Sequence, residues 1–282
     1  MSLFFSVQIA VFMSFKAFLV SLCGVLALVD IAWADSTILV QSTTSTRNSG
    51  FYDYILPLVK DELGISVKVV AVGTGAALKN AMNCDADVLL VHSRKREDRF
   101  VADGYASHRH DLMYNDYVIV GPESDPAGLT SNGDVALAMQ KIAAAKAKFV
   151  SRGDDSGTHG KEKALWQASG IDPVATGKHW YREAGSGMGE TLNLAVGIGA
   201  YTLSDRASWE AFANKAGFQI LLQGDKRLFN PYGVMLVSKA KCPSVNSDAG
   251  QAFIDWLVSP RGQAAIGKFR VGGKQLFFPN AK

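Results

Sequence analysis

Four segments of this chain combine an expected β-strand, a turn of small or hydroxyl-bearing residues, and the start of a helix. The turns occupy residues 42–46, 73–75, 151–158 and 185–189. Strands that alternate with helices in this way indicate a mostly parallel sheet with helices on both of its faces. The sequence therefore predicts an α/β fold in which the four turns lie at the carboxyl ends of strands.

The composition of these turns points to the binding of a small anion. A helix N-terminus presents unpaired backbone N–H groups and a partial positive charge. Glycine lets a ligand approach the backbone closely, and serine or threonine adds a hydroxyl donor. Arg152, in the third turn, is the only arginine in the four. Together, the turns predict the walls of a single oxyanion pocket.

We expect each turn to contribute main-chain N–H groups, hydroxyl groups or the Arg152 guanidinium to this pocket. The predicted anion-binding residues are Thr43, Thr44, Ser45, Thr74, Gly75, Arg152, Ser156, Gly157, Thr158, Met188 and Gly189. Asp154 or Asp155 is expected to orient Arg152 and to leave part of its guanidinium free. Simpler interpretations exist for each turn. Serine and threonine cap helices without any ligand, an arginine can pair with an aspartate alone, and residues 185–189 can form a flexible loop.

The first 34 residues have the pattern of a secretory signal peptide. Lys16 precedes an apolar run at 17–29, and the small-x-small motif at 32–34 predicts cleavage after Ala34. A permanent membrane anchor is the alternative, although the apolar run is short for a span of about 20 residues. No later segment of the sequence is apolar for long enough to cross a bilayer. We therefore expect a protein exported to the periplasm.

The mature chain is long enough for two compact lobes. A strand at 117–122 ends in a Gly-Pro breaker and is expected to cross into the second lobe, and a strand at 232–237 leads back. These crossings predict a first lobe of residues 35–120 with 232–282, a second lobe of residues 121–231, and a hinge between them. Small-ligand sites favour such interfaces, and contacts from both lobes would favour closure.

The charges and cysteines exclude some classes of partner and leave others open. The chain has 29 Lys and Arg against 26 Asp and Glu, without the basic, aromatic-interleaved stripe of a nucleic-acid-binding protein. Cys84 and Cys242 remain after cleavage, and in an exported protein they can form one disulfide. Their spacing alone does not establish this pairing. Two thiols without clustered histidines do not indicate a metal site.

The five histidines lack the spacing of metal ligands and are expected to be structural or exposed. They are His92, His108, His110, His159 and His179. His159 follows Ser156 by three residues, which raises the alternative of a secreted hydrolase. A serine nucleophile needs a base within hydrogen-bond reach, held by a third group, and the sequence shows neither a triad nor a G-x-S-x-G elbow here. We therefore expect a binding protein rather than an enzyme.

Longer motifs in fixed order extend this pattern over essentially the whole mature chain. They are Thr-Thr-Ser-Thr at 43–46, Val-Ala-Val-Gly-Thr-Gly-Ala-Ala-Leu-Lys at 70–79, Asp-Ala-Asp-Val-Leu-Leu-Val-His at 85–92, Met-Tyr-Asn-Asp-Tyr-Val-Ile-Val-Gly-Pro at 113–122, Ser-Arg-Gly-Asp-Asp-Ser-Gly-Thr-His at 151–159 and Ala-Tyr-Thr-Leu-Ser-Asp-Arg at 200–206. In these motifs the chain resembles the tungstate-binding, TupA-like receptors of ABC transporters. The resemblance implies a two-lobed periplasmic binding fold of type II, an anion site at the matching arginine and Ser/Thr positions, tungstate as the preferred cargo, and delivery to a membrane permease with its ATPase. Molybdate is a further candidate cargo, and we expect a monomer without a cofactor.

Phosphate is the main alternative ligand. Residues 152–158 also have the spacing of Arg, Asp, Ser, Gly and Thr seen in phosphate-binding receptors. Hydrogen phosphate keeps a proton near neutral pH and is best recognised by a buried carboxylate, which would repel fully deprotonated tungstate or molybdate. Residues 43–48 and 73–79 contain no Asp or Glu, which favours tungstate or molybdate. Asp154 and Asp155 leave the phosphate alternative open.

Overall fold

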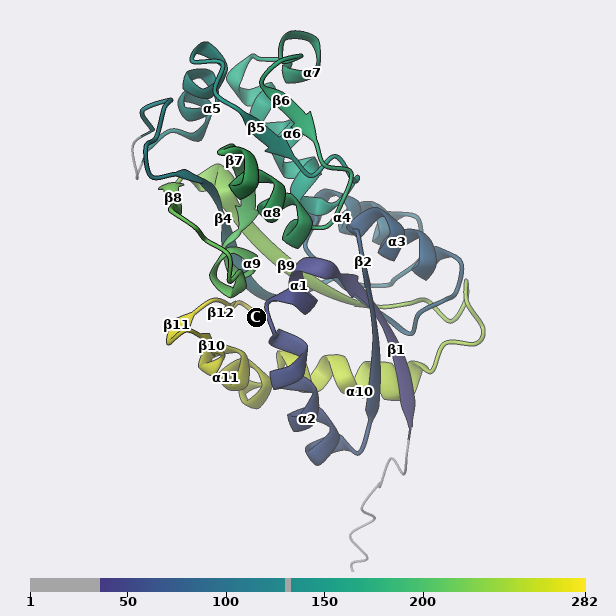
Figure 1. The fold of residues 1–282 in the computed structure, drawn as a ribbon. Helices are drawn as coiled ribbons and strands as arrows, with labels where there is room; N and C mark the ends of the chain where they lie inside the picture. Colours follow the sequence, from purple (N-terminus) through teal and green to yellow (C-terminus); the bar gives the residue numbers. More distant parts are fainter. Residues whose placement is uncertain (1–35, 130–132) are drawn as a thin grey trace, which may run out of the picture. The chain divides into compact units, whose positions relative to one another are not determined.

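The computed structural model describes residues 36–129 and 133–282 (Figure 1). The signal peptide and the cleavage site predicted within residues 1–34 lie outside the described residues. Within the described ranges, none of the helices combines the length and the apolar character that a membrane span requires.

The strands and helices alternate along most of the chain, as the sequence indicated. The strands are β1 (Thr37–Thr43), β2 (Ser66–Val72), β3 (Val88–Val91), β4 (His110–Pro122), β5 (Phe149–Ser151), β6 (Tyr181–Glu183), β7 (Tyr201–Asp205), β8 (Phe218–Leu222), β9 (Phe229–Leu236), β10 (Arg270–Val271), β11 (Lys274–Gln275) and β12 (Phe278–Pro279). The helices are α1 (Thr44–Asn48), α2 (Phe51–Leu63), α3 (Thr74–Met82), α4 (Arg94–Ala102), α5 (Val135–Ala144), α6 (Gly157–Ser169), α7 (Pro173–Thr176), α8 (Met188–Ile198), α9 (Arg206–Ala211), α10 (Ser247–Val258), α11 (Pro260–Lys268) and the 3₁₀ turn η1 (Lys226–Leu228).

One mixed sheet of ten described strands organises the fold. Its order is β2-β1-β3-β9-β4-β7-β5-β6, and β8 and β12 both pair with β4. At one end β1 pairs in parallel with β2 and β3, and at the other β5 pairs in parallel with β6 and β7. Between these groups, β9 and β4 run antiparallel to their neighbours. The α/β class is confirmed, and the central antiparallel pair is a feature that the sequence did not indicate.

Helices cover both faces of each parallel group. In β3, Val88 and Leu90 pack in a cluster with α2 and α10, whereas Leu89 and Val91 pack with α3 and α4. Successive side chains of a strand point to opposite faces, so a strand buried on both faces becomes apolar throughout. Around β5 and β7, one cluster includes residues of α5 and α6, and the other residues of α8 and α9. The division into lobes at residues 121 and 231 stays a prediction.

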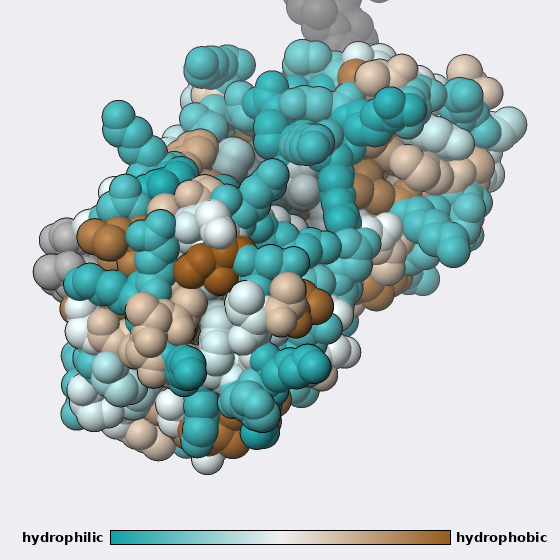
Figure 2. Space-filling model, turned by 90° about the horizontal axis from the view of Figure 1, so that it is seen from above, coloured by the Kyte–Doolittle hydropathy of each residue, from teal (hydrophilic) through white to brown (hydrophobic). Residues whose placement is uncertain are grey.

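Most of the exposed large apolar side chains in the described ranges lie apart from one another. On the face that Figure 2 shows, apolar residues lie singly or in small groups among hydrophilic ones. The most exposed are Val174 at 68% and Leu137 at 51%, which lie on different helices. Phe229 and Phe278 form a small exposed group, because both rings contact Tyr114. Single exposed apolar residues and small groups of them are normal on protein surfaces.

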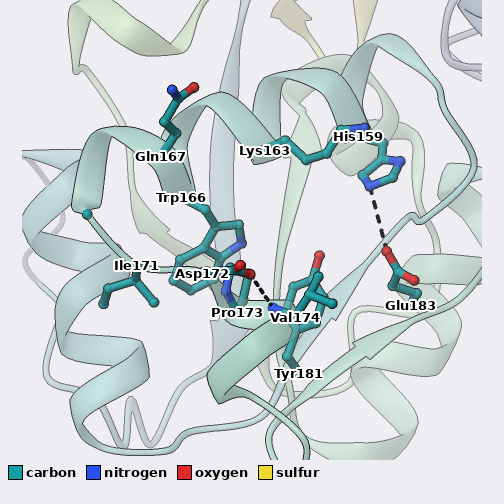
Figure 3. Close-up of a pocket in the computed structure, with 11 residues that line it drawn as sticks. His159, Lys163, Trp166, Gln167, Ile171, Asp172, Pro173, Val174, Tyr181 and Glu183 are labelled. Atoms are coloured by element: carbon teal, nitrogen blue, oxygen red, sulfur yellow. Dashed lines mark hydrogen bonds and ion pairs between the residues drawn. The ribbon is translucent and has the colours of Figure 1, made fainter.

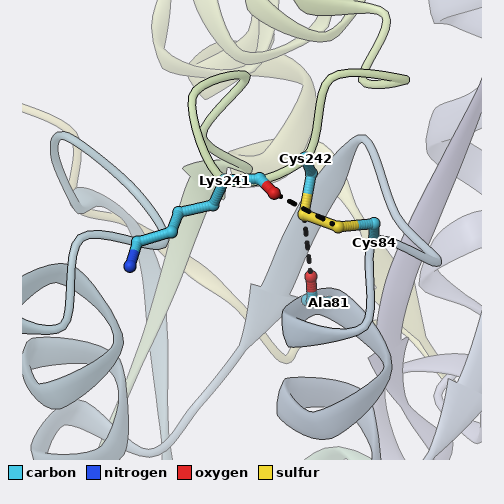
Figure 4. The surroundings of a disulfide bond; sticks show 4 residues. All are labelled: Ala81, Cys84, Lys241 and Cys242. Atoms are coloured by element: carbon cyan, nitrogen blue, oxygen red, sulfur yellow. Dashed lines mark hydrogen bonds between the residues drawn. A yellow bond between two sulfur atoms is a disulfide. The ribbon is translucent and has the colours of Figure 1, made fainter.

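A disulfide joins Cys84 to Cys242 across 158 residues of sequence, with the two Cα atoms 5.1 Å apart (Figure 4). The carbonyl oxygens of Lys241 and Ala81 lie 3.6 Å and 3.8 Å from the two sulfur atoms. The disulfide links the loop after α3 covalently to the segment between β9 and α10. It forms because β9 pairs with β3 and brings the C-terminal part of the chain back to the N-terminal strands.

Candidate functional site

The first predicted turn is the junction of β1 and α1. Thr43 is the N-cap residue of α1, and its Oγ1 accepts a hydrogen bond from the Thr46 N–H at 3.4 Å. Helix capping therefore accounts for part of this cluster. Thr44 Oγ1 is also buried, but it has no hydrogen-bond partner among the described residues. The first turn thus contains one hydroxyl group that the described protein leaves unsatisfied.

The second turn is in direct contact with the third. Thr74, at the start of α3, is buried, and its Oγ1 accepts a hydrogen bond from the Gly157 N–H at 3.1 Å. A Cβ at position 75 would lie 2.7 Å from Asp155 Oδ2 and 3.1 Å from an Arg96 nitrogen, so a larger residue there would displace these two side chains. Two turns that are 83 residues apart in sequence therefore form one continuous wall.

Arg152 lies in the third turn and is only 3% exposed. Its Nη2 donates to Asp154 Oδ2 at 2.5 Å, whereas its Nε is buried without a partner among the described residues. The expectation that one aspartate orients this arginine and leaves part of the guanidinium free is confirmed for Asp154. Asp155 pairs with Arg96 instead, at 2.6 Å between Oδ1 and Nη2.

The remainder of the third turn caps α6. Ser156 Oγ accepts a hydrogen bond from the His159 N–H at 3.1 Å. His159 Nδ1 accepts a hydrogen bond from the Asp155 N–H, also at 3.1 Å, so this nitrogen is already engaged by the backbone. The serine–histidine pair of a hydrolase is not formed in the described structure. Thr158 Oγ1 lies beside the Tyr117 hydroxyl, yet it is buried without a well-formed hydrogen bond in the described ranges.

The fourth turn is held against the third by backbone hydrogen bonds. The N–H groups of Ala184 and Ser186 donate to the carbonyls of Ser151 and Arg152, at 2.9 Å and 3.3 Å. Met188 begins α8 and is fully buried, and Gly189 follows it with partial exposure. Helix α8 also lies against α1. The structure therefore brings the residues predicted from all four turns into one region.

His92 also lies in this region, although it was not among the predicted anion-binding residues. The residue follows β3 directly and is 5% exposed. Its Nε2 lies 3.0 Å from Ser45 Oγ, and a Cβ added to Gly157 would lie 3.5 Å from its Cε1. Burial lowers the pKa of His92, which favours the neutral ring. One feature of the sequence could have placed His92 at the site: it comes immediately after a fully apolar strand, at the edge where the carboxyl ends of neighbouring strands meet.

The site is equipped to bind an anion. Thr44 Oγ1 and Arg152 Nε are buried groups that can each donate a hydrogen bond, and each lacks a partner among the described residues. Thr158 Oγ1 is a third buried hydroxyl group in this region, beside the Tyr117 hydroxyl. An oxyanion offers acceptors for such donors, and hydrogen bonds to a charged acceptor are about twice as strong as neutral ones. No group of three or more His, Cys, Asp or Glu side chains is arranged to hold a metal ion in the described ranges.

A separate surface pocket of about 410 Å³ lies on α6, α7 and β6 (Figure 3). It is lined by aromatic and polar side chains, among them Trp166, Tyr181 and Lys163. On one side His159 Nε2 faces Glu183 Oε1 at 3.8 Å. No predicted anion-binding residue lines this pocket, so it is distinct from the candidate site.

Residues 32–261 match the family model of the PBP superfamily domain. The fold, the site and this match define the chain as a member of the PBP superfamily. Three relatives narrow the assignment. The tungstate-binding protein TupA of Peptoclostridium acidaminophilum is 44% identical over 252 residues, which cover 88% of this chain and 87% of that protein. The solved structure of the tungstate-binding protein TupA from Desulfovibrio alaskensis G20 is 44% identical with a TM-score of 0.74, covering 88% of this chain and 100% of that one. The structure of the tungstate ABC transporter from Geobacter sulfurreducens is 45% identical with a TM-score of 0.76, covering 83% of this chain and 98% of that one. This chain therefore belongs to the TupA family.

Proposed function

We propose that this protein captures tungstate between its two lobes and delivers it to an ABC transporter. The proposal depends above all on the buried, unpartnered donors of Thr44 and Arg152, with the buried Thr158 hydroxyl as a third group in the same region. Leaving one buried polar group unsatisfied costs about 1–3 kcal/mol, so several in one region support a ligand that supplies the missing acceptors. The family relatives that are named for tungstate support the choice of anion.

The pairing of the acidic side chains supports tungstate over phosphate. Asp154 is engaged by Arg152 and Asp155 by Arg96, so neither carboxylate is placed as a free acceptor for the proton of hydrogen phosphate. The first two turns contain no acidic residue. A proton-free dianion needs donors only, and this arrangement provides them. Molybdate has the same charge and shape and is expected to bind as well.

Contacts between the proposed lobes support a closed, ligand-retaining arrangement. The Arg96 guanidinium holds Asp155 through both its carboxylate and its carbonyl oxygen, at 2.6 Å and 3.0 Å. The hydrogen bond from Gly157 to Thr74 lies alongside. In each pair, one residue belongs to the first proposed lobe and the other to the second. An anion that bridges the same turns would therefore stabilise closure.

The transport role follows from the same family relationship. We propose that residues 1–34 direct export to the periplasm and that the mature protein acts as a monomer which docks on a membrane permease with its ATPase. Its only ligand in this role is the anion, without a further cofactor and without catalysis.

A competition titration of the protein lacking residues 1–34 tests this function, because the described residues belong to one compact unit. Isothermal calorimetry would compare tungstate, molybdate, sulfate and phosphate at pH 8. We expect tungstate and molybdate to bind and to prevent the binding of each other, while sulfate and phosphate compete weakly. Preferential binding of phosphate, or no binding of either group 6 anion, would overturn the proposal.

A further inference from the structure

A chain of hydrogen bonds leads from the first turn into the centre of the sheet through His92. Thr43 Oγ1 lies 3.1 Å from Ser45 Oγ, which lies 3.0 Å from His92 Nε2. On the other side of the ring, His92 Nδ1 lies 2.9 Å from Asn230 Oδ1. Asn230 Nδ2 donates in turn to Asn115 Oδ1 at 2.6 Å. All five residues are buried, so these groups have to satisfy one another.

The orientation of Asn230 gives this chain a direction. Asn230 presents its Oδ1 to the ring, so His92 Nδ1 donates a proton to it. In a neutral ring, Nε2 then has only a lone pair and accepts the hydroxyl proton of Ser45. The Thr43 hydroxyl has two neighbouring acceptors, Thr46 Oγ1 at 2.8 Å and Ser45 Oγ at 3.1 Å. In this arrangement the hydroxyl proton of Ser45 is used inside the protein and is not available to an anion.

A proton on His92 Nε2 would reverse this part of the chain. The ring would donate to Ser45 Oγ, and the hydroxyl proton of Ser45 would be released to donate elsewhere, while Thr43 keeps Thr46 Oγ1 as a neighbour at 2.8 Å. No heavy atom has to move, since only hydroxyl groups rotate. The proton comes from the solvent and is held on Nε2, so no other group changes its charge.

The charged and titratable groups around His92 determine the pH range in which its ring is protonated. They are Asp205, Arg152, Lys161, Tyr117, Tyr232 and the ion pair of Glu97 with Arg109. Glu97 accepts a hydrogen bond from the N–H of Ser93, the residue that follows His92. Burial, Arg152 and Lys161 lower the pKa of His92, whereas the buried carboxylate of Asp205 raises it. Both tyrosines stay neutral, because burial raises the pKa of each. A dianion near Ser45 and Gly157 would place two negative charges close to the ring. These charges would stabilise the imidazolium form and raise the pKa of His92.

We propose that His92 is a positioning residue of the anion site, and that it takes up a proton when the anion binds and thereby turns the Ser45 hydroxyl group toward the ligand. This inference rests on the proposed function and adds the source of one of its donors. It also supplies a second positive charge for a dianion, since the charge of Arg152 is shared with Asp154. Anion affinity is then linked to pH through His92.

Calorimetry at several pH values tests the linkage. Tungstate at micromolar concentration would be titrated into the protein lacking residues 1–34 at pH 6, 7 and 8, in two buffers of different ionisation enthalpy. One linked proton changes affinity by at most about tenfold per pH unit, and we expect binding at pH 6 to be about 3- to 10-fold tighter than at pH 8. The difference between the binding enthalpies measured in the two buffers should show the uptake of up to one proton per bound anion.

Single histidine variants test which residue takes up the proton when tungstate binds. His92→Gln places an amide nitrogen where Nε2 lies and donates to Ser45 at every pH, so we expect binding without pH dependence or proton uptake. His179→Gln, at an exposed position, should behave as wild type. His159→Gln is the stricter control, because burial also lowers the pKa of His159 and its ring contacts the third turn. It should retain the proton uptake.

The outcomes separate this inference from the proposed function. If no tungstate binds at any pH, the function itself fails. If tungstate binds equally at pH 6 and 8 without proton uptake, or if His159→Gln removes the uptake while His92→Gln retains it, the role of His92 is refuted. Should His92→Gln fail to fold, ¹⁵N NMR of the wild-type imidazoles decides, since tungstate should convert Nε2 of His92 from an unprotonated to a protonated nitrogen.

Discussion

Replacement of Arg152 by alanine should weaken tungstate binding strongly. The Arg152 side chain is 3% exposed, and its Nε is a charged donor without a partner among the described residues. A hydrogen bond to a charged group contributes about 1.5–3 kcal/mol, which corresponds to about a 10- to 150-fold change in Kd. We therefore expect Arg152→Ala to raise the Kd for tungstate by at least tenfold.

The neighbouring Asp154 places the expected loss at the upper end of this range. Arg152→Ala leaves the carboxylate of Asp154 unpaired next to a dianion, and the side chain of Asp154 is only 16% exposed. The double variant Arg152→Ala/Asp154→Asn removes this repulsion and should recover part of the loss. Arg152→Lys keeps the charge but not the planar fork, so its Kd should fall between those of wild type and Arg152→Ala.

Calorimetry with tungstate at pH 8 measures these differences, and circular dichroism with thermal unfolding checks that each variant is folded. The reasoning is refuted if folded Arg152→Ala binds tungstate within about threefold of wild type. In that case the unpartnered Nε does not face the ligand, and the third turn is not a wall of the site.

Three further perturbations follow from the structure. Replacement of Cys84 and Cys242 by serine opens a loop of 158 residues and should lower the free energy of unfolding by up to about 5 kcal/mol, measured by urea denaturation. Burial raises the pKa of Glu162 to about 7, above its value in the unfolded chain, so its contribution to stability should be lost as pH rises from about 4.5 to 7. Glu162→Gln should flatten this part of the stability profile by up to about 3 kcal/mol. Arg96→Gln or Asp155→Asn should raise the dissociation rate of tungstate several-fold in stopped-flow measurements, because each removes a contact between the proposed lobes.

Each of these expectations has an outcome that contradicts it. Equal stability of the oxidised wild type and the double serine variant would show that the disulfide does not constrain the unfolded chain. A stability profile of Glu162→Gln that is parallel to wild type between pH 5 and 8 would assign the slope to another group. The exposed Glu123→Gln serves as the matched control for that variant. Dissociation at the wild-type rate in both lobe-contact variants would mean that the contact between Arg96 and Asp155 does not retain the ligand.

The parts of the site that are local in sequence could be predicted from it. Each of the four turns is a strand end followed by a helix start, and composition alone marks such junctions. The orientation of Arg152 by a nearby aspartate was also predictable, because Asp154 and Asp155 both lie within three residues of it, although the sequence did not distinguish between the two. In these cases the interacting groups lie within a few residues of one another, so local propensities and spacing carry the information.

The parts that depend on distant strand pairing could not be predicted. Residues 110–116 of β4 form a strand because β9 pairs with them from more than a hundred residues later, and the sequence indicated a strand only at 117–122. The same pairing places Asn230 opposite Asn115 and beside His92, 138 residues away. The disulfide also depends on the return of β9. Spacing does not report such geometry, so His92 was interpreted as structural or exposed.

A crystal structure of the protein with tungstate would test the central claim most directly, since the anomalous signal of tungsten locates the anion without ambiguity. We expect one strong tungsten peak between the four turns, with anion oxygens within hydrogen-bond distance of Thr44 Oγ1, Arg152 Nε and Thr158 Oγ1. A peak in the pocket beside α7, or turns that face away from a crevice filled only with water, would contradict the account.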